Sequence, residues 1–193
     1  MRKLIMKMSV SLDGFVSGPN GENDWVFKTG DEQSKAHSLA LNQMPGLIIM
    51  GRKIYEQWAK FWPTAPGPFA EPMNIIPKAV FTQKEFTKPQ PAAGQTAAEA
   101  SWAEARIISG NLTEEVEKLK AEEGKPILTM GGAGFMRSLI AAGLIDEYHL
   151  FIHPVVLGGG QRIFTDVTAP FYLKLADVQH FPGGATALTY LKA

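Results

Sequence analysis

The sequence contains no cysteine among its 193 residues. This absence excludes disulfide bonds, zinc sites built on thiolates and catalysis by a thiol. The chain also lacks a net charge, because 19 basic residues balance 19 acidic ones. There is therefore no electrostatic reason to expect nucleic acid as a partner, and no basic stripe with interleaved aromatic residues points to one.

Long hydrophobic runs are missing as well. No stretch approaches the roughly 18 apolar residues of a membrane helix, so we expect no membrane partner. Lys7 interrupts the first apolar stretch, and we therefore expect no signal peptide. The apolar content of 45% and the charged content of 20% are ordinary for a globular protein. We predict a cytoplasmic protein.

Strand-like and helix-like segments alternate along the chain, which is typical of an α/β fold with a partly parallel sheet. Pro182-Gly183-Gly184 predicts a hairpin between two final strands, at 171–181 and 185–192. The remaining patterns predict strands at 4–10, 47–50, 79–82, 106–109, 127–130 and 148–156. They predict helices at 31–44, from 53, from 111 to about 124 and from 135 to about 143. We interpret 12–30 and 63–74 as loops, 87–101 as a surface excursion, and residues 1–193 as one domain.

Three glycines, Gly131, Gly132 and Gly134, stand between a predicted strand and an amphipathic helix. The first N–H groups of a helix lack intrahelical acceptors, and the helix dipole is positive at that end. Glycines there let a phosphate approach the backbone. The alternative is a tight turn with close packing, since the pattern is not the spaced G-x-G-x-x-G fingerprint.

A second strand-to-helix corner has the sequence Gly51-Arg52-Lys53. Two basic residues oppose the dipole preference at a helix start, which favours an anionic partner over plain solvation, and arginine suits phosphate. A third strand end carries Thr82-Gln83-Lys84, which taken alone is an ordinary polar strand exit. Ligands of open α/β sheets lie beyond the carboxyl ends of the strands. Three such ends predict an elongated, multiply phosphorylated ligand.

These segments, together with SLDGF at 11–15 and VLGGGQRIF at 156–164, resemble the dihydrofolate reductase-like family. The similarity is greatest to the C-terminal reductase domain of the bacterial riboflavin-biosynthesis deaminase-reductase. The resemblance implies a single-domain, three-layer fold, with a central, mostly parallel mixed sheet, helices on both faces and a C-terminal antiparallel hairpin. It also implies NADPH as cofactor and a homodimer.

The resemblance assigns roles to individual residues. It implies that the segment 51–53 contacts the cofactor phosphates and that 82–84 lies near the adenosine. It places the pyrophosphate against Gly131, Gly132, Ala133, Gly134, Phe135 and Met136. The SLDG loop and residues 21–25 would lie over the nicotinamide and the substrate, which makes Asp13, Asp24 and Trp25 candidates for substrate binding.

The sequence departs from the riboflavin-type pattern at three charged positions. Met130 stands where that pattern has a glutamate, Ala40 where it has an arginine, and 61–64 reads Phe-Trp-Pro-Thr without its basic residue. Those charges hold a phosphorylated ribosylamino-pyrimidine in the family. Their loss leaves the cofactor side intact and predicts a different, less charged substrate.

Asp13 is the candidate catalytic acid, because reduction often requires a proton beside the nicotinamide. The alternative is that Asp13 organises its own loop. Trp25 either stacks on a flat substrate ring or caps the core. The four histidines lack metal-ligand spacing, so we predict no metal site.

The leading hypothesis is therefore an NADPH-dependent reductase of a pterin- or pyrimidine-like heterocycle or of a carbonyl compound, related to 5-amino-6-(5-phosphoribosylamino)uracil reductase. A non-catalytic, homodimeric NADP-binding module is the alternative.

Overall fold

The computed structural model describes residues 1–87 and 94–193. Within it the chain forms two compact units. Unit 1 comprises Met1–Arg2 and Leu39–Gly132, and unit 2 comprises Lys3–Ser38 and Ala133–Ala193. The organisation of residues 1–193 as one domain stays a prediction.

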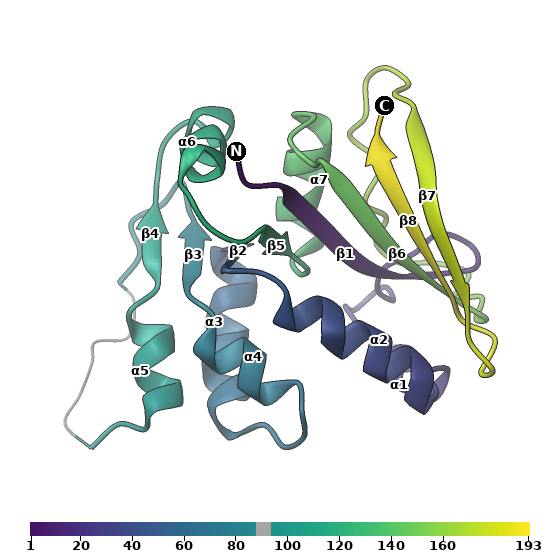
Figure 1. Ribbon diagram of the computed structural model, residues 1–193, viewed down its shortest axis with the longest axis horizontal. Helices are drawn as coiled ribbons and strands as arrows, with labels where there is room; N and C mark the ends of the chain where they lie inside the picture. Colours follow the sequence, from purple (N-terminus) through teal and green to yellow (C-terminus); the bar gives the residue numbers. More distant parts are fainter. Residues whose placement is uncertain (88–93) are drawn as a thin grey trace. The chain divides into compact units, whose positions relative to one another are not determined.

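Unit 1 contains four parallel strands in the order β4-β3-β2-β5 (Figure 1). Parallel strands are buried on both faces and therefore read as continuous apolar runs. The run Ile48-Ile49-Met50 is such a case, since each side chain is fully buried. The strands are β2 (Leu47–Gly51), β3 (Lys78–Phe81), β4 (Arg106–Ile108) and β5 (Ile127–Thr129).

The helices of unit 1 include three that the sequence analysis missed, at 62–64, 70–75 and 97–103. Residues 63–74 are not all loop, because Pro63 and Pro72 both lie in first turns, where a missing N–H does no harm. The predicted helix start at Asn111 is confirmed, since its side chain accepts the N–H groups of Thr113 and Glu114. The helices are α3 (Arg52–Phe61), η1 (Trp62–Thr64), α4 (Ala70–Ile75), α5 (Ala97–Ala103) and α6 (Leu112–Ala121).

The predicted surface excursion at 87–101 is only partly described, because residues 88–93 lie outside the described residues. Its last part belongs to α5, which begins with a capping box between Thr96 and Glu99. Helix α5 joins the core of unit 1 through Trp102, which is 1% exposed. The hydroxyl of Tyr55 on α3 donates a hydrogen bond of 2.6 Å to the Trp102 carbonyl. The two helices are thereby tied to each other.

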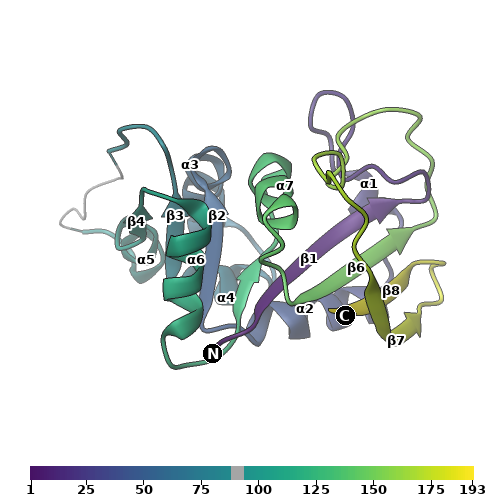
Figure 2. The same cartoon turned by 90° about the horizontal axis from the view of Figure 1, so that it is seen from above.

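Unit 2 contains four strands in the order β1-β6-β8-β7. Strands β1 and β6 are parallel, whereas β8 is antiparallel to both of its neighbours. The C-terminal hairpin is therefore confirmed, and the C-terminus ends beside it (Figure 2). The strands are β1 (Leu4–Ser11), β6 (Glu147–His153), β7 (Leu173–His180) and β8 (Thr186–Lys192).

Helices cover both faces of the unit 2 strands. On one face, Lys7 of β1 donates to Ser38 of α2 (Glu32–Gln43), and the ring of His37 packs on Phe151. On the other, α7 (Ala133–Ala141) shares a cavity lining with Tyr148. The predicted loop at 12–30 is wrong over one turn, α1 (Trp25–Lys28), where the buried Trp25 side chain anchors a short helix. Across the described residues, no helix has the length and apolarity needed to cross a membrane.

Candidate functional site

Three of the predicted ligand-binding segments lie at one edge of the unit 1 strands. Gly51 pairs with Phe81, which directly precedes Thr82. Ile48 of β2 pairs with Leu128 of β5, and Gly131, two residues after the end of β5, lies against Ile54 and Trp58 of α3. Adjacent strands are about 4.8 Å apart. The two glycine corners are therefore neighbours at the carboxyl end of the strands, where ligands of α/β sheets bind.

The amino end of α3 is open to an anion. Gly51 is the N-cap residue in extended conformation, and as a glycine it has no side chain that could cap this end. The first backbone N–H groups of α3 therefore receive no acceptor from the N-cap side chain. Together with the positive end of the helix dipole, they form the environment that a phosphate requires.

The basic residues at this corner are less available than the sequence suggested. Arg52 forms an ion pair of 2.7 Å with Glu56 one turn along α3, and its side chain is 30% exposed. A ligand phosphate would compete with this carboxylate for the guanidinium. Lys53 is exposed. Of the two cations at this corner, Lys53 is exposed and Arg52 is partly neutralised by Glu56.

At the third strand end, two of the three polar side chains stabilise their own turn. The Thr82 hydroxyl donates to the carbonyl of Lys84 and accepts its N–H, at 2.9 and 3.2 Å. The Gln83 amide donates to the carbonyl of Gly110 at 2.9 Å. Lys84 itself is exposed, so it is the group here that remains open to a ligand.

Gly131 is required by the packing of the protein itself. A Cβ atom at this position would lie 2.5 Å from Cη2 and 2.7 Å from Cζ2 of Trp58, and 3.3 Å from Ile54. Helix α3 therefore packs directly on the backbone of residue 131. Gly132 has a φ of +80°, which favours glycine for conformational reasons. Close packing and turn geometry account for both residues without excluding contact of their N–H groups with a ligand.

One buried polar atom beside this corner has no partner. Thr129 is fully buried, and its hydroxyl makes no hydrogen bond with any described residue. Buried hydroxyl groups are nearly always paired, so an exception requires an explanation such as an additional bound molecule. The groups at this edge that are open to a phosphorylated cofactor are the start of α3 at Gly51 and the exposed Lys53 and Lys84.

The remaining predicted cofactor residues open α7 in unit 2. Met136 is fully buried, so its side chain belongs to the core. Gly134 is exposed in the first turn, and a Cβ there would meet nothing closer than the Arg137 side chain at 3.9 Å. The cofactor contacts of Ala133, Gly134, Phe135 and Met136 stay predictions.

Asp13 joins two loops of unit 2. Its carboxylate accepts hydrogen bonds from the Ser11 hydroxyl at 2.7 Å and from the backbone N–H groups of Leu157 and Gly158 at 3.1 and 2.7 Å. The Ser11 hydroxyl, followed by these backbone donors, lowers the pKa of Asp13 to about 2. A carboxylate that is ionised at neutral pH is a poor proton donor. The geometry favours loop organisation, and the catalytic role of Asp13 stays a prediction.

Trp25 is 5% exposed and packs edge-to-face on His153, with ring centroids 5.3 Å apart. This position supports the core interpretation over stacking on a substrate. Asp24 forms an exposed ion pair with Lys28 one turn along α1. The substrate contacts of both residues stay predictions.

A buried hydrogen-bond chain behind Trp25 was not anticipated. The Thr29 hydroxyl donates to the Trp25 carbonyl at 2.7 Å, so it accepts from Nδ1 of His153 at 2.8 Å. Nε2 then accepts from the Ser9 hydroxyl at 3.2 Å. Burial lowers the pKa of His153, because desolvation disfavours the charged ring. Thr29, His153 and Ser9 thus form a chain of polar side chains without an acidic partner among the described residues.

Lys7 is a further titratable group that sequence reasoning missed. Its amine donates to the backbone carbonyl and the hydroxyl of Ser38, and it lies 5.8 Å from the ring centroid of Phe151. Burial lowers the pKa of Lys7 to about 7. A single lysine inside an apolar strand was the signal in the sequence.

His149 and His153 are hydrogen-bonded residues of β6. His149 pairs with Glu147 at 2.6 Å and approaches Thr189 at 3.3 Å. Among the described residues, no group of three or more His, Cys, Asp or Glu side chains is arranged to hold a metal ion.

Comparison with solved structures defines the class of fold. A putative riboflavin biosynthesis protein from Shewanella sp. PV-4 superposes with a TM-score of 0.78 at 20% identity, over 99% of each chain. Dihydrofolate reductase from Enterococcus faecalis, complexed with NADP(H) and RAB-propyl, superposes with a TM-score of 0.62 at 11% identity, over 98% of this chain and 96% of that one. The expected dihydrofolate reductase-like α/β fold is confirmed.

The family follows from the sequence match. Residues 2–187 match the model of the RibD C-terminal domain, and the chain belongs to this family. Among curated proteins, the uncharacterized protein YyaP of Bacillus subtilis (strain 168) is 35% identical over 191 residues, which cover 98% of this chain and 94% of YyaP. The resemblance inferred from the short motifs is therefore confirmed.

Proposed function

We propose that this protein is an NADPH-dependent reductase that transfers hydride to a small heterocyclic substrate, pterin- or pyrimidine-like, or to a carbonyl compound. Membership of the RibD C-terminal family supports an oxidoreductase linked to riboflavin-type metabolism. Solved structures of the same fold include a RibD from Acinetobacter baumannii and a dihydrofolate reductase complexed with NADP(H).

The observation that carries the proposal is that Gly51 ends β2 and Gly131 follows the neighbouring strand β5 and packs on α3, whose N-cap is Gly51. Two bare backbone corners at one sheet edge suit the pyrophosphate of a dinucleotide. Arg52, Lys53 and Lys84 are candidates for the 2′-phosphate that distinguishes NADPH from NADH.

When bound, the cofactor supplies the hydride, and the chain's own residues manage orientation and protons. Asp13 holds the SLDG loop to residues 157–158. The polar chain of Ser9, His153 and Thr29 suits an uncharged, hydrogen-bonding substrate, in keeping with the loss of charges at 40, 61–64 and 130.

The test compares the affinities of the two dinucleotides. Arg52→Ala should weaken NADPH roughly 10- to 100-fold, the range for a charge-assisted hydrogen bond, and change NADH little. Lys60→Ala, an exposed lysine in the last turn of α3, is the matched control and should change neither. Equal weakening of both dinucleotides by Arg52→Ala would remove the 2′-phosphate assignment. Absence of any NADPH-induced rise in melting temperature would remove the cofactor itself.

The alternative function is a homodimeric module that binds NADP without turnover. The pKa of Asp13, about 2, favours it, because the carboxyl group that the sequence analysis proposed as acid is ionised. Steady NADPH oxidation with any member of a panel of pterins, pyrimidines and small carbonyl compounds would exclude this module. We also propose the homodimer itself, with the exposed Leu175 and Val178 of β7 as its apolar contact. Light scattering should then give twice the chain mass of 21.1 kDa.

A further inference from the structure

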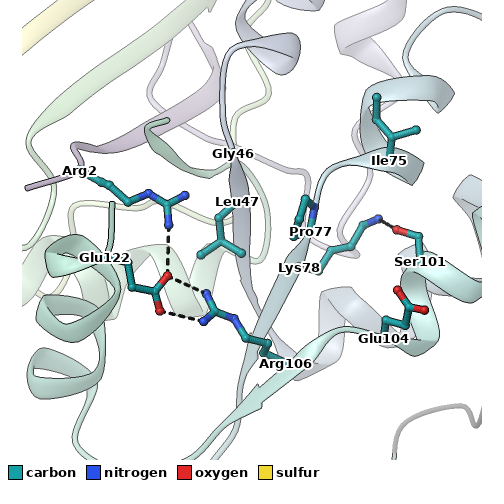
Figure 3. A pocket seen from close by; sticks show the side chains of 10 residues that line it. All are labelled: Arg2, Gly46, Leu47, Ile75, Pro77, Lys78, Ser101, Glu104, Arg106 and Glu122. Atoms are coloured by element: carbon teal, nitrogen blue, oxygen red, sulfur yellow. Dashed lines mark hydrogen bonds and ion pairs between the residues drawn. The ribbon is translucent and has the colours of Figure 1, made fainter. Parts of the chain in front are cut away.

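Unit 1 contains a cavity of about 360 Å³ at the edge opposite the proposed cofactor site (Figure 3). Leu47, Lys78 and Arg106, the first residues of β2, β3 and β4, line it. Gly51 and Thr82 lie at the other ends of β2 and β3. A cavity of this size lies within the range of small-molecule sites, roughly 300–1,000 Å³.

Two arginines share one carboxylate at one end of this cavity. Arg106 binds Glu122 through both guanidinium nitrogens, at 2.8 and 3.2 Å, and Arg2 reaches the same carboxylate at 3.3 Å (Figure 3). Two positive charges thus face one negative charge. We call Arg2, Arg106 and Glu122 the arginine end. Its three side chains carry a net charge of +1.

Arg2 is the buried member of the arginine end, with 6% of its side chain exposed. Nε donates to the carbonyl of Lys125 at 2.6 Å and Nη1 to Glu122, so within the described chain two of the five guanidinium N–H donors are used. Glycines flank the group: a Cβ at Gly46 would lie 3.4 Å from Nη2, and one at Gly124 would lie 3.8 Å from Nε. A buried cation with unmet donors is costly unless an anion completes it.

At the opposite end of the cavity, the positive and negative charges balance. The amine of Lys78 donates to the carbonyl of Asn74 and to the hydroxyl of Ser101, at 2.9 and 2.7 Å. Glu104 lines the same end and supplies the opposing charge. Between the two ends lie the apolar side chains of Leu47 and Pro77, and Ile75 lines the cavity on the side of Lys78 (Figure 3).

We propose that this cavity binds a small organic anion, with its carboxylate or phosphate group against Arg2 and Arg106 and its apolar body on Leu47 and Pro77. The bound oxyanion neutralises the arginine end and accepts the unmet N–H donors of Arg2. Guanidinium groups match both oxyanions through paired hydrogen bonds. The cavity and the cofactor edge lie at opposite ends of the same strands. The protein therefore binds both ligands at the same time, each at its own site.

The probes are benzoate, inorganic phosphate and benzamidine, titrated by calorimetry at constant ionic strength. Benzoate and benzamidine share a ring but carry opposite charges, so benzoate should bind saturably and benzamidine should not. Phosphate separates the oxyanion from the apolar body. Binding of phosphate as tight as that of benzoate would refute the role of Leu47 and Pro77. No saturable binding of either anion up to about 10 mM, a free energy weaker than about −3 kcal/mol, would overturn the site.

Two substitutions change the charge of the arginine end in opposite directions. In Arg106→Gln the charge of Arg2 is neutralised by Glu122, and the affinity for benzoate should fall at least tenfold. Glu122→Gln raises the net positive charge of the arginine end from one to two and should increase the affinity for benzoate. Lys118→Gln, an exposed lysine on α6 outside the cavity, is the control and should change nothing. Melting temperatures report whether each variant is folded.

The outcomes separate this site from the proposed function. Equal effects of Arg106→Gln and Lys118→Gln, or equal binding of benzamidine, would refute an anion site. Benzoate affinity should be the same with and without saturating NADPH, and mutual exclusion would refute the separate location. Failure of NADPH to bind at all leaves the benzoate results intact and overturns the cofactor assignment alone.

Discussion

Gly131→Ala tests whether the protein's own packing accounts for this glycine. The added methyl would lie 2.5 Å from a ring carbon of Trp58 and 3.3 Å from Ile54. Carbon atoms prefer separations of about 3.5–4.0 Å, so the indole or the backbone at residue 131 must shift by about 1 Å. Overpacking of this kind typically costs about 1–3 kcal/mol. The substitution should therefore destabilise the protein by that amount.

The matched control is Gly134→Ala, three residues along the same segment. Its Cβ meets only the flexible Arg137 side chain at 3.9 Å, and the position is helical. Replacing a helical glycine by alanine gains about 0.5–1 kcal/mol. The two variants thus change stability in opposite directions although each adds the same single methyl group.

Urea and thermal unfolding measure both effects. In a chain of this size, 1 kcal/mol corresponds to a change in melting temperature of roughly 2–4 °C. Gly131→Ala should lower the melting temperature by about 2–12 °C, and Trp58→Leu in the same chain should recover part of the loss. An unchanged stability of Gly131→Ala, or a penalty that persists in full without the Trp58 ring, would refute the packing argument. The glycine would then have to be explained by the ligand.

Three further predictions concern single side chains. Asp13→Asn should lower the free energy of unfolding at pH 6. Because the folded pKa of Asp13 lies at about 2, below its ordinary value of 3.8, the difference from the wild type should disappear as the pH falls from about 4 to 2, which acid titration of unfolding would show. Lys7→Met should stabilise the fold at pH 7, since the folded pKa of about 7 lies below the ordinary 10.5. Between these two pKa values the unfolded state binds more protons than the folded state, so the wild type gains stability as the pH rises. In urea unfolding, the stability advantage of Lys7→Met should therefore shrink toward pH 10. An advantage that does not depend on pH would contradict this prediction. Tyr55→Phe removes one of two donors to the Trp102 carbonyl, which keeps the N–H of Ala105, and should cost about 0.5–1.5 kcal/mol by chemical denaturation; an unchanged stability would contradict a contribution of this hydrogen bond.

Several elements followed from local sequence because the cause is local. The alternation from Leu4 to Val10 predicted β1, and the side chain of Asn111 marked the start of α6. The short helices α1 and α4 did not follow, because they are stabilised by burial of Trp25 and Met73 in the tertiary structure rather than by periodicity.

In the candidate site too, features of a single segment could be predicted from the sequence, whereas features that depend on distant neighbours could not. Strand-to-helix glycines and nearby basic residues could be located from the sequence, since backbone N–H groups and helix dipoles are properties of one segment. The ion pair of Arg52 with Glu56, four residues apart on one helix, was also accessible to inspection. The unmet hydroxyl of Thr129 was not, because satisfaction of a buried group depends on every neighbour.

The sequence by itself determined the alternating α/β pattern, the C-terminal hairpin and the positions of the glycine corners. Only the tertiary structure decided what these residues contact. Gly131 accommodates Trp58, Asp13 accepts hydrogen bonds from a loop far along the chain, and burial shifts the pKa of Lys7 toward neutrality. The physical reason is that conformational preference is local, whereas close packing, desolvation and charge balance are set by residues that only the fold brings together.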